Sequence, residues 1–86
     1  MRNIRFEDAA FDDFSNWALY DKQVFKKIIE LIKHSVRQPF EGLGKPEPLK
    51  FDKRGYWSRR INAEHRLVYK IDENGDIHIA SCKGHY

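Results

Sequence analysis

The sequence has few residues of the kinds that build disulfide frameworks or membrane spans. Cysteine and methionine each occur once and proline three times in 86 residues. A single cysteine cannot form an internal disulfide, which is typical of a reducing compartment. No apolar run approaches the length of a membrane span, and the N-terminus lacks the apolar segment of a signal peptide. We therefore expect a cytoplasmic protein with no membrane association.

Length and charge narrow the class of protein further. A chain of 86 residues, 14% of them aromatic, predicts one domain over residues 1–86 with one compact core. Residues 1–43 carry seven basic and seven acidic side chains, whereas residues 44–86 carry nine and six. The net charge of +3 therefore resides in the second half. Such a basic segment indicates a polyanionic partner, either nucleic acid or an acidic protein tail.

The first half has the pattern of a strand followed by two helices. Residues 2–6 alternate, and residues 8–20 place apolar side chains at helical spacing. Asp21 suits an N-cap, and the second helix must end before Pro39. Because about one residue joins the helices, we expect an antiparallel hairpin. His34, at the end of the second helix, is expected to be a surface residue or one that complements the helix dipole.

Residues 40–50 have neither a helical nor a strand period and predict an ordered loop. Glu47 stands between Pro46 and Pro48, and both prolines restrict the backbone around it. A carboxylate on such stiff backbone is well suited to act as an aimed base. The alternative is a plain solvent-facing turn.

The second half has the pattern of a meander of strands. Residues 56–61, 65–71 and 77–83 alternate, and Asn74-Gly75 favours a two-residue type I′ turn. The fold class predicted is α+β: an N-terminal strand, an antiparallel helix hairpin, then an antiparallel sheet with both helices on one face.

These turns predict a register for the sheet. Arg60 should face Arg66, and Arg66 should face Lys83, with His85 pointing to the same side. The other face should carry the core, formed by Leu67, Tyr69, Ile71, Ala80 and Cys82. Like charges directly opposite destabilise a sheet, and a phosphate-binding site explains their presence. The alternative is that each arginine pairs with a local carboxylate such as Glu64, or points into water.

The residue types on this face are those that RNA cleavage by the 2′-hydroxyl requires. Glu47 could serve as general base, His85 as general acid, and Arg60 with Arg66 could stabilise the charged phosphorane. Lys50 would help to keep Glu47 ionised, and Tyr86 could stack on a base. This chemistry needs no metal and no cofactor. A zinc site or a cysteine nucleophile is disfavoured, because His78 and Cys82 share one strand face and His85 the other.

Four stretches together resemble one known family, the YoeB (Txe) toxins. They are Pro-Phe-Glu-Gly-Leu-Gly-Lys-Pro-Glu-Pro-Leu-Lys (39–50), Tyr-Trp-Ser-Arg-Arg-Ile (56–61), Glu-His-Arg-Leu-Val-Tyr (64–69) and the terminal His85-Tyr86. The resemblance implies the microbial-ribonuclease-like fold of the RelE and ParE toxins. It also implies a type II toxin that cleaves mRNA in the ribosomal A site, is neutralised by a YefM-type antitoxin and forms a homodimer when free.

The same resemblance implies a role for each site residue. Glu47 would be the general base, His85 the general acid and Arg66 the transition-state stabiliser, with Arg60, Lys50 and Tyr86 in support. The chain departs from the family in a turn at 72–76 that is about one residue longer, and in Gly84, where a bulkier residue is expected. The alternative function is that of a non-catalytic binding toxin, such as a gyrase poison of the ParE type.

Overall fold

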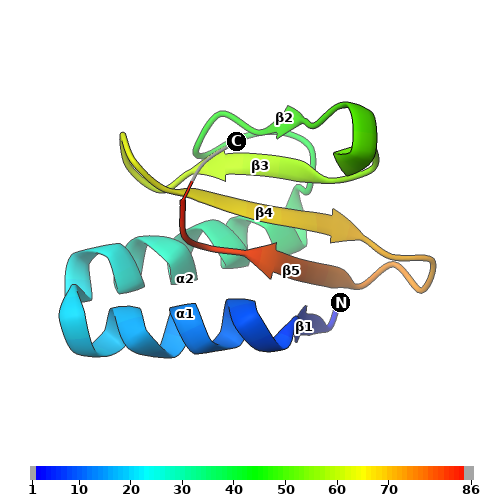
Figure 1. Cartoon of the computed structure of the whole chain (residues 1–86). Helices are drawn as coiled ribbons and strands as arrows, with labels where there is room; N and C mark the ends of the chain where they lie inside the picture. The colour runs from blue at the N-terminus through cyan, green and yellow to red at the C-terminus, as the bar shows by residue number, and fades with distance from the viewer. Residues whose placement is uncertain (1, 85–86) are drawn as a thin grey trace.

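The computed structural model describes residues 2–84 and has the predicted order of elements. They are β1 (Ile4–Phe6), α1 (Asp8–Tyr20), α2 (Lys22–Arg37), β2 (Glu47–Pro48), the 3-10 turn η1 (Phe51–Lys53), β3 (Trp57–Arg60), β4 (Arg66–Ile71) and β5 (Ile77–Ser81). Both helices lie on the same side of the strands (Figure 1). The predicted α+β class is therefore confirmed.

Asp21 alone connects the two helices, as the sequence predicts. Its backbone N–H donates to the Trp17 carbonyl and so completes the last turn of α1. Its carboxylate accepts from the backbone N–H groups of Gln23 and Val24, each at 3.2 Å. Satisfying these two otherwise unpaired N–H groups starts α2 at the next residue. The helices therefore form a tight hairpin.

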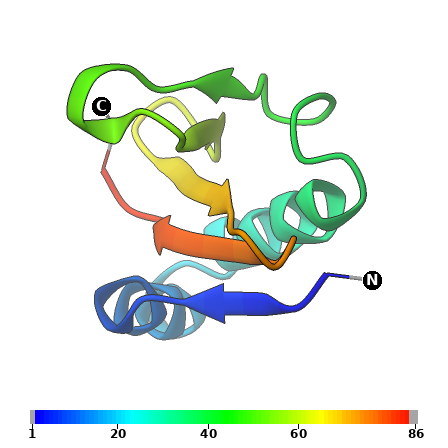
Figure 2. The same cartoon turned by 90° about the vertical axis from the view of Figure 1, so that its right-hand side faces the viewer.

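The sheet has the strand order β1-β5-β4-β3-β2. All neighbouring strands are antiparallel except β1 and β5, which are parallel. The chain must pass through both helices between these two strands, and the connection brings β1 alongside the last strand (Figure 2). The sheet is thus mixed, and the N-terminal strand is its parallel member.

The connection between β4 and β5 differs from the predicted two-residue turn. The Asp72 carboxylate accepts from the N–H groups of Asn74 (2.9 Å) and Asp76 (3.0 Å), so three residues, 73–75, form the turn. Further along, Tyr69 pairs with Ile79 but Val68 pairs with Ser81. Ala80 is therefore the extra residue of a β-bulge.

The three-residue turn and the bulge together change the predicted faces of β5. Ala80 was expected in the core, but Ile77 and Ile79 are the residues that are completely buried there. The bulge then reverses the alternation, so that Cys82 is buried as expected. The core joins α1, α2 and the sheet through Ala10, Val24, Ile28, Leu31, Ile32, Ile61, Leu67, Tyr69, Ile77, Ile79 and Cys82.

Candidate active site

Two arginines lie directly opposite each other on the sheet face that the helices leave open. Arg60 of β3 pairs with Arg66 of β4, as predicted. Arg66 Nη1 donates to the carbonyls of Asn62 (2.8 Å) and His65 (3.1 Å), so main-chain oxygens hold the guanidinium in place. Arg60 is exposed.

No carboxylate neutralises this pair within residues 2–84. Neither Arg60 nor Arg66 forms an ion pair there, and Glu64 instead lies 3.8 Å from Nε2 of His65. The alternative of local carboxylate pairing is therefore not observed. Two adjacent guanidinium groups with free donors are suited to bind an anion such as a phosphodiester.

Glu47 lies on the same face as this pair. It was expected in a loop, but with Pro48 it forms the short edge strand β2, where Glu47 pairs with Ser58 and Pro48 with Trp57. Proline is tolerated at a sheet edge because no further strand needs its missing N–H group. Backbone pairing to β3, in addition to the prolines, therefore fixes the backbone at Glu47.

The strand register sets the spacing between the carboxylate and the two cations. Glu47 and Ser58 share one row of the sheet, and the Arg60–Arg66 pair lies two residues further along. With strands about 4.8 Å apart and about 3.3 Å per residue, the Glu47 backbone is roughly 8 Å from that of Arg60 and 12 Å from that of Arg66. A phosphodiester fits between side chains that extend toward each other over such spans. Lys50, also exposed, follows Glu47 at the start of η1.

Arg59 is a buried residue whose role the sequence did not reveal. Its side chain has no exposed surface, and it donates to main-chain carbonyls of the loop that connects α2 to β2. The acceptors are Gln38 (2.5 Å), Glu41 (3.0 Å) and Leu43 (2.8 Å). These hydrogen bonds from Arg59 fix the position of residues 38–43, the segment that leads to Glu47.

Two side chains complete the environment of Arg59. Its Nε donates to the Tyr69 hydroxyl (3.0 Å), and its Nη1 lies 3.2 Å from Nδ1 of His34. His34 is partly buried in the last turn of α2, where a basic group complements the helix dipole, and it is in addition a partner of Arg59. The signal in the sequence was the alternation of residues 56–61, which put an arginine on the core-facing side between Trp57 and Ile61.

The chain is also held where it approaches the terminal pair. Trp17 Nε1 donates to the Cys82 carbonyl (3.0 Å), and the Gly84 N–H donates to Nδ1 of His65 (2.9 Å). The Gly84 carbonyl in turn accepts from the Arg66 N–H (2.8 Å). The predicted acid His85 and the supporting Tyr86 lie outside the described residues.

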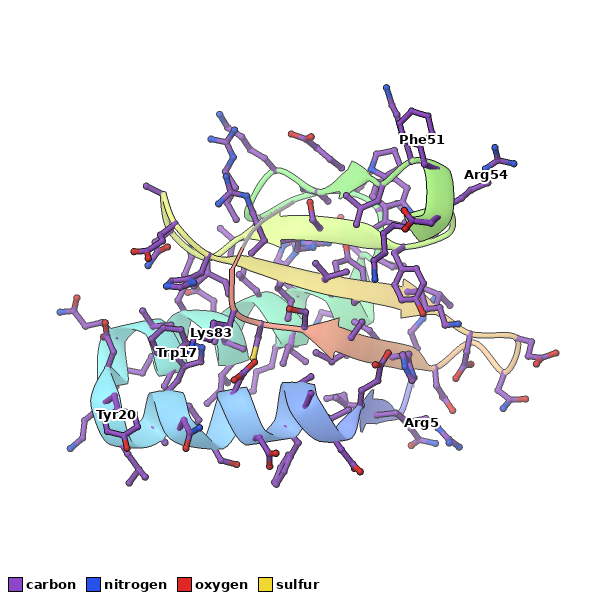
Figure 3. The ribbon with its side chains drawn as sticks, in the orientation of Figure 1. Arg5, Trp17, Tyr20, Phe51, Arg54 and Lys83 are labelled. Carbon is purple, nitrogen blue, oxygen red and sulfur yellow. The ribbon has the colours of Figure 1, made fainter. Side chains whose placement is uncertain are left out.

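Lys83 does not join the arginine pair, in contrast to the prediction. It lines a small pocket of about 100 Å³ with Asp13, Trp17 and Tyr20 beside α1, on the helix side of the molecule (Figure 3). After the bulge the backbone still bonds to β4 through the Arg66 N–H and the Gly84 carbonyl, but the Lys83 side chain lines the pocket beside α1. The cationic face is therefore built from β3 and β4.

Metal binding and thiol chemistry are the other kinds of site that the sequence raised. Among residues 2–84, no group of three or more histidine, cysteine or acidic side chains could hold a metal ion. Burial, assisted by the charge of Asp13, raises the pKa of the Cys82 thiol to about 12, so it stays protonated near neutral pH. No helix in this part of the chain is long and apolar enough to cross a membrane.

Comparison with known proteins gives matches over nearly the whole chain. Residues 6–86 match the family described as YoeB-like toxin of bacterial type II toxin–antitoxin system. Toxin YoeB of Escherichia coli (strain K12) is 51% identical over 81 residues, which cover 94% of this chain and 95% of that protein. The YoeB–YefM complex from Staphylococcus aureus contains a chain that is 52% identical, with a TM-score of 0.89 and coverage of 100% of this chain and 99% of that chain.

A YoeB dimer from Staphylococcus aureus is also similar. Its chain is 52% identical, with a TM-score of 0.91 and coverage of 99% of this chain and 98% of that chain. The same family is indicated by the fold, by these similarities and by the motifs at residues 39–50, 56–61 and 64–69. The chain belongs to the YoeB-like toxin family of bacterial type II toxin–antitoxin systems.

Proposed function

We propose that this toxin is a metal-independent endoribonuclease that cleaves mRNA in the ribosomal A site and thereby inhibits translation. The observation that carries the proposal is the placement of Glu47 on the same sheet face as the Arg60–Arg66 pair, which no carboxylate of residues 2–84 neutralises. A carboxylate beside free cations on an open surface suits in-line attack on a phosphodiester. A protein that only binds has no need of the base.

In the proposed reaction, Glu47 takes the proton of a 2′-hydroxyl, and the 2′-oxygen forms a bond to the adjacent phosphorus. The bond from phosphorus to the 5′-oxygen breaks, and His85 donates a proton to that oxygen. Arg66 stabilises the charge that develops on the phosphorane, because main-chain acceptors already hold its guanidinium in place. Arg60 and Lys50 add positive charge, and Tyr86 stacks on a base.

The same face is the proposed target of the antitoxin. The similar chain from Staphylococcus aureus occurs in a complex with YefM, and another occurs as a dimer. We infer a YefM-type antitoxin for this chain and a homodimer when it is free, in the cytoplasm. An acidic antitoxin segment that covers Arg60 and Arg66 would exclude RNA from the same site.

Primer extension on mRNA from a translating extract tests the proposed mechanism. Glu47→Gln and His85→Ala should each lower the cleavage rate by about 10²–10⁴-fold, because each removes a proton-transfer group. Glu41→Gln is the matched control, since Glu41 is an exposed acid of the same loop whose carbonyl, and not its side chain, contacts Arg59. Undiminished cleavage by Glu47→Gln would refute the mechanism. Toxicity with DNA damage and no mRNA cleavage would support the gyrase alternative.

A further inference from the structure

Phe51 is held outside the core at the edge of the proposed active site. Its side chain is 85% exposed, a larger fraction than for the other exposed large apolar residues of the described chain. It opens η1, three residues after β2 ends. In a small protein with an aromatic-rich core, a phenylalanine so exposed contributes little to folding.

The backbone of Phe51 is also unusual. Its φ angle is +58°, in the left-handed region that glycine adopts freely and bulky side chains avoid. Strained residues of this kind occur preferentially at functional sites, where the surrounding structure maintains them. The 3-10 turn maintains this one through the bonds from the Lys53 N–H to the Lys50 carbonyl (3.1 Å) and from the Arg54 N–H to the Phe51 carbonyl (3.1 Å).

The surroundings of the ring are basic. Residues 50–54 include Lys50, Lys53 and Arg54 against the single acid Asp52. Phe51 and Arg54 project from the same end of the molecule (Figure 3). Residues 48–53 line an open groove of about 390 Å³ that begins where the strand bearing Glu47 ends. The groove therefore extends from the Glu47 strand in the direction away from the Arg60–Arg66 pair.

We propose that Phe51 is a stacking platform for a base of single-stranded RNA, with Lys50 and Arg54 contacting the flanking phosphates. This proposal rests on the proposed function and adds a subsite to it. An exposed ring stacks on any base because every base presents a π face, and basic side chains beside it follow the backbone. A nucleotide on Phe51 would lie next to the segment that passes Glu47, and so would help to align the scissile phosphate.

A protein partner could also use an exposed phenylalanine, as an apolar anchor. Two observations favour RNA. Lys50 and Arg54 are basic residues close to Phe51 in the sequence, and the groove starts beside Glu47 of a site whose proposed substrate is a polyanion. The two occupants also require different chemistry of residue 51: a protein pocket needs apolar volume, which leucine supplies, whereas stacking needs a flat π surface.

Fluorescence anisotropy of a labelled, single-stranded 2′-O-methyl RNA of mixed sequence tests the proposal. This probe lacks the attacking hydroxyl, so its binding is independent of cleavage. Phe51→Ala and Phe51→Leu should both weaken binding by about tenfold, whereas Phe51→Tyr should bind within about twofold of the wild type. Leu19→Ala is the matched control, because Leu19 is a 76% exposed apolar side chain at the end of α1. Circular dichroism would establish that each variant is folded.

The possible results are distinct. Wild-type affinity in Phe51→Leu, or no binding of the probe by the wild type, would overturn the proposal. A loss of antitoxin affinity in Phe51→Ala with RNA affinity unchanged would assign the ring to a protein interface instead. If Glu47→Gln binds the probe normally and still cleaves mRNA, the proposed mechanism fails while the stacking site stands.

Discussion

The buried Arg59 contacts the partly buried His34, with Nη1 of the arginine 3.2 Å from Nδ1 of the histidine. A guanidinium only donates, so Nδ1 must accept, and the imidazole proton resides on Nε2. The buried cation is therefore solvated by an imidazole, a tyrosine hydroxyl and loop carbonyls, and no carboxylate is among its partners in residues 2–84. This arrangement couples the end of α2, the core of the sheet and the loop that leads to Glu47.

Replacing Arg59 should destabilise the fold by removing the donors that hold the loop at residues 38–43. Arg59→Met keeps much of the volume but leaves the carbonyls of Gln38, Glu41 and Leu43 without their donor. We expect the free energy of unfolding to fall by about 3 kcal/mol or more in urea titrations. The matched control is Arg60→Met, because Arg60 is the neighbouring residue and its side chain is exposed. This substitution should change the free energy of unfolding by less than about 0.5 kcal/mol. Equal effects of the two substitutions would show that Arg59 does not organise the loop.

Gly44 should tolerate a side chain less well than Gly75, although their φ angles are nearly equal at +84° and +82°. A Cβ on Gly44 would lie 2.9 Å from Leu31 Cδ2 and 3.2 Å from the Arg60 carbonyl, whereas nothing lies within 4 Å at Gly75. Both alanine variants carry the backbone strain, but only Gly44→Ala adds a steric clash. Thermal unfolding should therefore show a lower midpoint for Gly44→Ala, and a lower midpoint for Gly75→Ala would contradict the packing described for the loop.

His65 should hold the backbone that leads to the terminal pair. In His65→Ala the Gly84 N–H loses its acceptor, Nδ1 of His65. Trp17 also loses the edge-on contact with the imidazole ring, whose centroid lies 4.9 Å from that of the indole. The Gly84 amide should exchange with solvent about tenfold faster, and mRNA cleavage should decrease with it. His78→Ala is the control, because His78 pairs with Glu7 at the other end of β5. Unchanged Gly84 exchange in His65→Ala would remove this role.

The Cys82 thiol should make stability depend on pH in the alkaline range. Its pKa is raised from 9.0 to about 12 in the folded state, chiefly by burial and further by Asp13. The unfolded thiol ionises from about pH 9 upward while the folded one stays protonated, so this contribution to stability is complete below pH 9 and is lost as the pH rises toward 12. Subtracting the urea-unfolding profile of Cys82→Ala should isolate this decrease. A difference that does not depend on pH would contradict it.

Local patterns in the sequence predicted most helices and strands and the arginine pair of the candidate site. Asp21 between two amphipathic stretches specified the helix hairpin, because a cap and a helical period are properties of neighbouring residues. The alternation of residues 56–61 and 65–71, with a short turn between them, specified that Arg60 faces Arg66. Side chains alternate between the two faces of a strand with a period of two residues. Counting residues across one short turn therefore gives both the face and the pairing of each residue.

The tertiary structure decided what depends on distant segments. Glu47 joined a strand because β3 offered an edge, and the position of Lys83 depends on the packing of residues 82–84 against Trp17 and His65. The burial of Arg59 required the α2–β2 loop to fold over it and supply carbonyls from 16 to 21 residues away in sequence. The sequence by itself determined which residues could do the chemistry. Only the packing of segments far apart in the chain decided which side chains are buried and where Glu47 and Lys83 lie, since burial and bulges depend on contacts that no local pattern contains.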